Sequence, residues 1–325
     1  MTAKTTRNST TTEIAHLHGI IVPLVTPLLQ RYQLDEAGLE KLIDHVLTGE
    51  VSGLFILGTT GEGTSLSYKI RRQLIEKSCQ INSARCPVLV GITDTSITES
   101  LGLAEQAADA GADAVVAAPP YYLDINQTEL LHYYEKLAAE LSLPLFLYNQ
   151  PGNCKVAFEP KTVFELAQLD NIIGMKDSSK NTAKFQQAMH LLEKPVNLKK
   201  QDNFEKPGNF SFFMGPDSLM AQAVLSGAAG GVNAGANIHP KLYVELYQAA
   251  AAAQLETVHH LQSKVLRILS GIYAVSGDRL GTIKGLNCAL NLMGIGTGFT
   301  IEPVSPLNAQ QKNTIKTTLG ELELI

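Results

Sequence analysis

The sequence lacks a long apolar run, a close pair of cysteines and an excess of positive charge. A membrane-spanning helix needs about 18 or more mostly apolar residues, so we expect no span. The four cysteines, Cys79, Cys86, Cys154 and Cys288, lack the close spacing of zinc and redox motifs, so we expect reduced, structural thiols. A formal charge of -5 gives no basic footprint for nucleic acid. These absences leave small molecules as the expected partners.

The first 16 residues also lack the apolar core of a secretory signal. They are rich in Thr and Ser and carry two basic residues, Lys4 and Arg7. We expect residues 1–16 to form a disordered tail on a cytoplasmic protein. An organellar transit peptide is the alternative that this composition leaves open.

The rest of the chain alternates short apolar runs with amphipathic stretches. Apolar runs predict strands at 19–26, 53–57, 87–91, 114–118, 144–148, 172–176, 210–214 and 229–232. Helical patterns follow each run, at 35–47, 67–84, 96–111, 127–141, 160–169, 181–192, 217–226 and from about 239. Asp35 is expected to cap the first of these helices, and Gly111 to end the third in a left-handed conformation. Eight such units predict an α/β fold, a closed (β/α)8 or TIM barrel over residues 17–253. A doubly wound open sheet is the alternative.

Beyond the barrel, three helical patterns near 255–272, 279–293 and 306–322 predict a C-terminal helical region over residues 254–325. Residues 194–209 are polar and contain two prolines, which is typical of a surface insertion.

Lys176 ends an otherwise apolar strand, at the barrel end where reactive side chains gather. A charged residue in a doubly buried strand needs a cavity or a partner. Among apolar walls its ammonium is desolvated, and the free amine attacks carbonyls, which indicates Schiff-base chemistry. Gly174, on the same face, is expected to leave room beside the lysine stem. The alternative is an ion pair with Asp177 or another carboxylate.

Tyr148 ends the preceding strand, and adjacent strands lie roughly 4.8 Å apart, so its hydroxyl should neighbour the lysine amine. A phenol in this position can relay protons to carbinolamine and aldol oxygens. Otherwise, a tyrosine at a strand end usually packs its ring against apolar neighbours and leaves its hydroxyl at a polar surface. The pairing with Lys176 favours the relay.

Two glycine-rich loops follow strands. In Gly58-Thr59-Thr60-Gly61-Glu62-Gly63, backbone N–H groups and two hydroxyls suit a carboxylate ligand, although any tight turn favours glycine. We interpret Glu62 as a helix-start carboxylate rather than a general base. The other loop, residues 227–233, could bind phosphate as loops after eighth barrel strands do, but without a nearby cation we favour close packing.

Five short segments carry a resemblance to a known family. They are Gly58-Thr59-Thr60-Gly61-Glu62, Pro119-Pro120-Tyr121-Tyr122, Tyr148-Asn149-Gln150-Pro151, Gly174-Met175-Lys176-Asp177 and Gly215-Pro216-Asp217. In these residues, and in their order and spacing from about residue 19 to the end, the chain resembles the N-acetylneuraminate lyase and dihydrodipicolinate synthase family of class I pyruvate-dependent aldolases.

The resemblance implies that Lys176 forms an imine with the keto carbon of pyruvate, and that the enamine attacks an aldehyde or arises by the reverse cleavage. It implies that Tyr148 relays protons and that Thr59 and Thr60 hold the pyruvate carboxylate. The covalent imine replaces any cofactor, so neither a metal nor an organic cofactor is implied.

The resemblance also assigns residues around the pocket. Gly215 and Val232 would line it through their backbones. Tyr122 matches a tyrosine that family members lend across a subunit interface, with Thr59 linking it to Tyr148. A homotetramer built as a dimer of dimers is therefore expected.

One departure bears on the substrate. Dihydrodipicolinate synthases carry an arginine two residues after the proline of Tyr-Asn-x-Pro, where it grips the carboxylate of the aldehyde substrate; here Asn153 occupies that position. A neutral amide cannot form the bidentate, charged hydrogen-bond pair that a guanidinium makes with a carboxylate. We therefore expect an aldolase or lyase that acts on a 2-keto-3-deoxy sugar acid or a 4-hydroxy-2-oxo acid, with Asn153 near the aldehyde half.

Two alternatives stay open. One is a diverged synthase that condenses pyruvate with aspartate semialdehyde, with its positive charge supplied elsewhere, for example by Lys155. The other, from a different class, is a non-catalytic barrel that binds a keto acid.

Overall fold

The structure is a computed structural model that describes residues 14, 16–31, 33–193 and 210–325. Most of the expected tail, residues 1–16, and all of the expected insertion, residues 194–209, lie outside the described residues. Ile14, within the expected tail, is buried at 2% exposure.

Eight parallel strands close into a barrel in the order β1-β10-β9-β8-β7-β6-β5-β4. Because β1 pairs with both β4 and β10, the barrel has no open edge. The predicted closed barrel is confirmed, and the open sheet is excluded. The strands are β1 Gly19–Pro23, β4 Gly53–Ile56, β5 Val88–Gly91, β6 Ala114–Ala117, β7 Leu145–Asn149, β8 Ile172–Asp177, β9 Ser211–Met214 and β10 Gly230–Val232.

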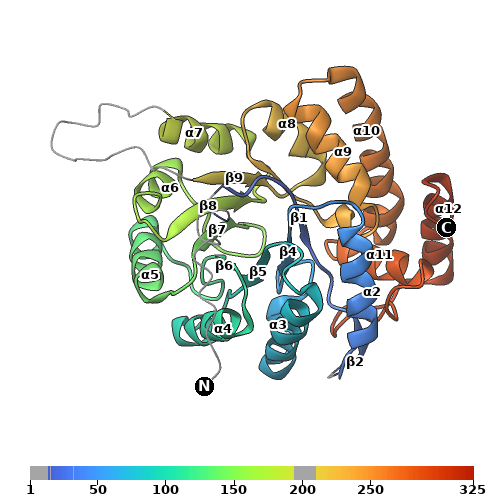
Figure 1. Ribbon diagram of the computed structural model, residues 1–325, viewed down its shortest axis with the longest axis horizontal. Coiled ribbons are helices and arrows are strands. Elements are labelled where there is room, and N and C mark those ends of the chain that lie inside the picture. The colour runs from blue at the N-terminus through green and yellow to red at the C-terminus, as the bar shows by residue number, and fades with distance from the viewer. Residues whose placement is uncertain (1–13, 15, 32, 194–209) are drawn as a thin grey trace.

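A ring of helices surrounds these strands (Figure 1). Asp35 caps the first of them by accepting a hydrogen bond from the Gly38 N–H, and the third ends at Gly111 with φ 85°, both as predicted. The helices are α2 Glu36–Leu47, α3 Tyr68–Asn82, α4 Ile97–Ala110, α5 Gln127–Glu140, α6 Pro160–Leu166, α7 Thr182–Glu193, α8 Met220–Leu225 and α9 Pro240–Ala251.

Within the barrel, the structure corrects the prediction after the first strand and at the start of the helix predicted at 217–226. The first predicted strand stops at Pro23, and an unpredicted hairpin of β2 (Leu28–Gln30) and β3 (Gln33–Leu34) follows, with strands too short to give an alternating pattern. The helix predicted at 217–226 begins as a 3-10 turn, Asp217–Leu219.

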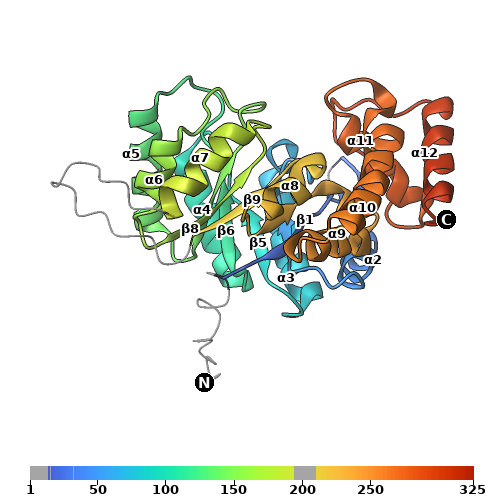
Figure 2. The same cartoon turned by 90° about the horizontal axis from the view of Figure 1, so that it is seen from above.

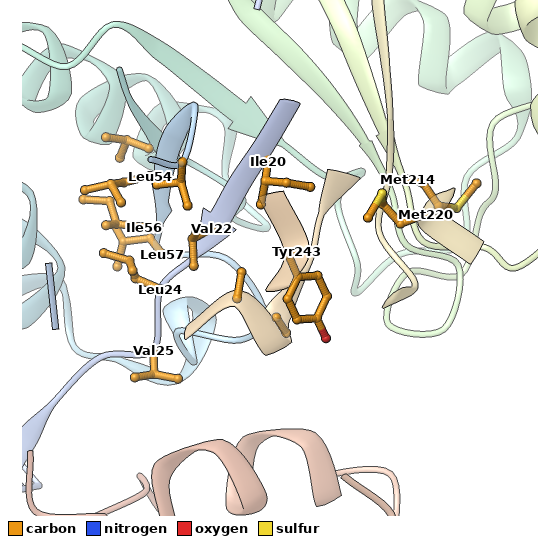
Figure 3. Packing of buried hydrophobic residues seen from close by; sticks show 14 of the residues in the cluster. Ile20, Val22, Leu24, Val25, Leu54, Ile56, Leu57, Met214, Met220 and Tyr243 are labelled. Carbon is orange, nitrogen blue, oxygen red and sulfur yellow. The ribbon is translucent and has the colours of Figure 1, made fainter. Parts of the chain in front are cut away.

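Buried side chains form two layers because successive strand residues point to opposite faces. Val22, Leu54 and Ile56 belong to the layer between strands and helices (Figure 3). Phe55 and Phe213 belong to the inner layer, which fills the barrel interior.

The C-terminal region consists of α10 Leu255–Ile268, α11 Gly281–Leu292 and α12 Ala309–Glu321. Figure 2 shows these helices together on one side of the barrel. The helix predicted to reach 272 changes to a π-helical turn at Leu269–Tyr273, and the Tyr273 hydroxyl donates to Asp217 Oδ1 at 3.3 Å. Among the described residues, every helix is too short or too polar to cross a bilayer.

Candidate active site

Lys176 and Tyr148 lie side by side at the carboxyl ends of β8 and β7. They are directly paired in the strand register. The Lys176 Nζ lies 4.3 Å from the centre of the Tyr148 ring and 5.1 Å from that of Phe55. The predicted neighbourhood of amine and phenol is confirmed.

The surroundings of Lys176 are apolar. The residue is 6% exposed, and within the described part of the chain it forms no ion pair. Asp177, the expected alternative partner, instead accepts hydrogen bonds from Asn149 Nδ2 at 2.6 Å and from the N–H and hydroxyl of Ser179 at 2.8 and 2.7 Å. The ion-pair interpretation is therefore wrong, and the amine faces aromatic rings.

Gly174 has a different role from the predicted one. A β-carbon at this position would collide with the Phe146 ring and would lie 2.6 Å from the Ser211 carbonyl oxygen. The space that glycine leaves is filled by Phe146, so Gly174 lets the barrel interior close below the site.

The Tyr148 hydroxyl has two side-chain neighbours. It lies 3.2 Å from Thr59 Oγ1, the contact that the resemblance implies, and it accepts a hydrogen bond from Gln150 Nε2 at 3.4 Å. Gln150 stands one residue after the strand and was not among the predicted site residues. Its position in the Tyr-Asn-Gln-Pro segment was the only available signal.

The loop after β4 presents Thr59 and Thr60 at the same end of the barrel. Thr59 is exposed and Thr60 half-buried. Glycine is required at 63, because a β-carbon there would collide with the Leu57 carbonyl. The Thr26 hydroxyl donates to the Gly61 carbonyl at 2.7 Å, which ties the loop to the end of β1. These contacts fix the loop in which Thr59 reaches the Tyr148 hydroxyl.

Glu62 stands at a helix start, as predicted, but its carboxylate makes a different contact from the expected one. It precedes a 3-10 turn, Gly63–Ser65, but makes no capping hydrogen bond. Its Oε2 accepts from the Ile301 N–H at 3.0 Å, whereas its buried Oε1 has no partner among the described residues. Burial raises the pKa of Glu62 to about 7, which the bond from Ile301 partly opposes. Glu62 therefore ties the loop to the C-terminal region.

Gly215 and Val232 also lie at this end of the barrel. The Gly215 N–H donates to the Asp177 carbonyl at 2.7 Å, and its own carbonyl accepts from Asn233 Nδ2 at 3.1 Å. Val232, at 4% exposure, packs in the inner layer with Tyr148. A β-carbon on Gly230 would collide with the Gly19 backbone, so the glycine at this position serves close packing, as predicted for residues 227–233.

Tyr122 and Asn153 lie on exposed loops beside the site. The Tyr122 side chain is 73% exposed. Lys155 Nζ donates to the Tyr122 carbonyl at 2.7 Å and lies 5.7 Å from the centre of its ring. Asn153 is exposed, and its N–H donates to the Gln150 carbonyl at 3.0 Å. A cation that was not predicted reaches this loop from the C-terminal region, where Arg279 Nη2 donates to the Gly152 carbonyl at 2.7 Å.

The described residues contain no group of three or more His, Cys, Asp or Glu side chains placed to hold a metal ion. The four thiols are unpaired there, and burial raises the pKa of Cys154 to about 11. Neither result supplies an alternative reactive group to Lys176.

A buried amine beside a phenol, at the carboxyl end of a closed (β/α)8 barrel, is the arrangement of a Schiff-base-forming aldolase. The comparisons agree. The model of the "Dihydrodipicolinate synthetase family" matches residues 16–322. The chain belongs to this family of class I pyruvate-dependent lyases and aldolases.

Its relatives carry two kinds of name. A 4-hydroxy-tetrahydrodipicolinate synthase of Acidiphilium cryptum is 30% identical, over 95% of this chain and 99% of its own. A protein of Escherichia coli named "Probable 2-dehydro-3-deoxy-D-pentonate aldolase YjhH" is 33% identical, over 82% and 85%. The structure of a dihydrodipicolinate synthase from Bacteroides thetaiotaomicron has a TM-score of 0.87 at 48% identity, covering 94% and 98%.

Proposed function

We propose that the protein cleaves or forms a 2-keto acid through an imine on Lys176, with pyruvate as one half. The observation that carries this proposal is the buried Lys176 amine, which lies near two aromatic rings and forms no ion pair with any described carboxylate. The imine stands in place of a metal or organic cofactor.

In the cleavage direction, the Lys176 amine adds to the C2 keto carbon of the substrate to give a carbinolamine. Tyr148 donates its proton to the carbinolamine hydroxyl, which leaves as water, giving a protonated imine and the Tyr148 phenolate. Tyr148 accepts the proton of the C4 hydroxyl as the C3–C4 bond breaks and its electron pair moves into the enamine. Reprotonation at C3 and addition of water then release pyruvate and the free amine.

The other residues act by binding. Thr59 orients the Tyr148 hydroxyl, and Thr60 with the neighbouring N–H groups holds the pyruvate carboxylate. The backbones of Gly215 and Val232 line the pocket. Asn153 lies near the aldehyde half.

For the substrate, we propose a 2-keto-3-deoxy sugar acid or a 4-hydroxy-2-oxo acid. Neutral Asn153 supports this choice over aspartate semialdehyde, and an aldolase name among the relatives agrees with it. The synthase reaction is the second candidate, because other relatives carry that name.

We further propose a homotetramer, a dimer of dimers. Tyr122 and Leu123, 73% and 66% exposed, would be covered by a second subunit. Light scattering after size-exclusion chromatography measures the mass, and a monomer at micromolar concentration would contradict the assembly.

Borohydride trapping tests the chemistry. Pyruvate with borohydride should add a reduced pyruvyl group to a peptide containing Lys176. Lys176→Arg, which keeps the charge, should remain unlabelled. Wild-type protein without label would refute the imine, and binding of pyruvate without pyruvate release from any keto acid would indicate the non-catalytic barrel.

A further inference from the structure

Arg279 brings a positive charge to the rim of the site from the C-terminal region. It lies in the turn before α11, and its Nη2 donates to the carbonyl of Gly152, in the loop after β7. That loop follows the strand that carries Tyr148. A residue 127 positions away in sequence therefore stands next to the loop in which Asn153 is neutral.

The guanidinium of Arg279 retains most of its hydrogen-bonding capacity. It has five N–H donors, and the Gly152 carbonyl is its one acceptor among the described residues. No described carboxylate forms an ion pair with it, and Arg279 is exposed. The adjacent Asp278 carboxylate accepts from Lys284 Nζ at 2.7 Å and from the Leu280 N–H at 2.8 Å instead.

A row of polar groups connects the phenol to this guanidinium. Gln150 Nε2 donates to the Tyr148 hydroxyl at 3.4 Å. A β-carbon on Gly152 would lie 3.7 Å from Gln150 Oε1 and 3.2 Å from Arg279 Nη2. Starting at the Lys176 amine, the next groups are the phenol of Tyr148 and the amide of Gln150, and the guanidinium of Arg279 follows. A substrate whose keto carbon is bound to the amine would extend past the phenol, with its far end toward the loop that Arg279 contacts.

We propose that Arg279 binds a carboxylate at the far end of the aldehyde half, so that the substrate is a 4-hydroxy-2-oxo acid with a second carboxylate. This inference rests on the proposed function. Cleavage of the C3–C4 bond through the Lys176 imine then gives pyruvate and an aldehyde that carries the second carboxylate. An arginine fork pairs with a carboxylate through two parallel hydrogen bonds, which suits this recognition.

Lys155 is the rival cation on the same loop. Its Nζ is already engaged by the Tyr122 carbonyl and lies over the Tyr122 ring. The ammonium keeps two further N–H donors, but only the guanidinium of Arg279 offers the parallel pair of N–H donors that matches both oxygens of a carboxylate.

The test compares two substrates that differ only at the far end. 4-Hydroxy-2-oxoglutarate has a terminal carboxylate, and 4-hydroxy-2-oxopentanoate has a methyl group there. Pyruvate release is measured for the wild type, Arg279→Met, Arg279→Lys, Lys155→Met and a control, Arg72→Met, on the exposed face of α3. Borohydride trapping of pyruvate on Lys176 is measured in parallel for each variant.

We expect Arg279→Met to lower kcat/KM for the diacid about 10- to 100-fold, mainly through KM, because a charged hydrogen-bonded contact is lost. For 4-hydroxy-2-oxopentanoate, which has no terminal carboxylate, the variant should change kcat/KM by less than about 2-fold, because the lost contact was never made. Arg279→Lys should recover part of the loss, and Lys155→Met and Arg72→Met should resemble the wild type. Pyruvate trapping should be equal in all five proteins.

Three results would overturn the proposal about Arg279 while trapping remains intact. They are equal losses on both substrates, no loss on the diacid, or a loss carried by Lys155→Met instead. Aspartate semialdehyde carries a carboxylate too, and a faster condensation of it with pyruvate than cleavage of the diacid would overturn the substrate class. Absent trapping in the wild type would refute the proposed function itself.

Discussion

Replacing Glu62 by glutamine should change how stability depends on pH. The folded carboxyl has a pKa raised from 4.5 to about 7 by burial, so folding disfavours its ionised form. The protonated carboxyl therefore stabilises the folded protein relative to the ionised form. This contribution to stability is fully present below pH 4.5 and is lost as pH rises through about 7. At 1.36 kcal/mol for each pKa unit, the cost of the charge approaches about 3 kcal/mol above pH 7.

Glu62→Gln removes the titration and keeps the contact. The amide oxygen can still accept from the Ile301 N–H, the bond that Oε2 makes. We therefore expect the variant to gain stability relative to the wild type as pH rises from 4.5 to 8, by up to about 3 kcal/mol.

The assay is urea unfolding of both proteins at several pH values, at one protein concentration because assembly contributes to stability. Glu40→Gln, an exposed position on α2, is the matched control. Parallel pH profiles for wild type and Glu62→Gln would refute the reasoning, since they would mean that Glu62 titrates alike in the folded and unfolded states.

The remaining predictions concern the site and its support. Tyr148→Phe should lower kcat for pyruvate release by about 100- to 10,000-fold while Lys176 is still trapped, because the variant loses only the hydroxyl; unchanged turnover would retire the proton relay. Gly174→Val should cost at least about 1–3 kcal/mol in urea unfolding, because its β-carbon meets the Phe146 ring; wild-type stability would show that the ring can move. Asp94→Ala should cost about 3 kcal/mol, because it leaves the buried Arg71 without the carboxylate 3.1 Å away. Equal midpoints of thermal unfolding for the wild type and Asp94→Ala would contradict that estimate.

Local sequence patterns predicted most of the fold. Alternation of apolar and amphipathic stretches gave all eight barrel strands, and Asp35 and Gly111 marked helix ends through capping geometry that depends on a few neighbouring residues. The β2–β3 hairpin was missed because strands of 3 and 2 residues carry no period.

The same local logic predicted the centre of the site. A lysine and a tyrosine that end consecutive strands must meet when the strands pair in parallel, and the register places Tyr148 opposite Lys176. The ion pair with Asp177 was a mistaken alternative, since Asn149 and Ser179 satisfy that carboxylate. Sequence alone could not decide this, because it does not show which partners a side chain finds.

The sequence by itself determined eight strand-helix units with an amine and a phenol at the ends of consecutive strands, because the period of each strand and the order of strands along the chain are read locally. Closure of the barrel was decided by the tertiary structure, through the pairing of β1 with β10 and β4. Only the tertiary structure decided which distant groups surround that pair. Glu62 meets Ile301 across 239 positions and Arg279 meets Gly152 across 127. Such contacts depend on how the C-terminal helices pack against the barrel, and no spacing within either segment encodes them.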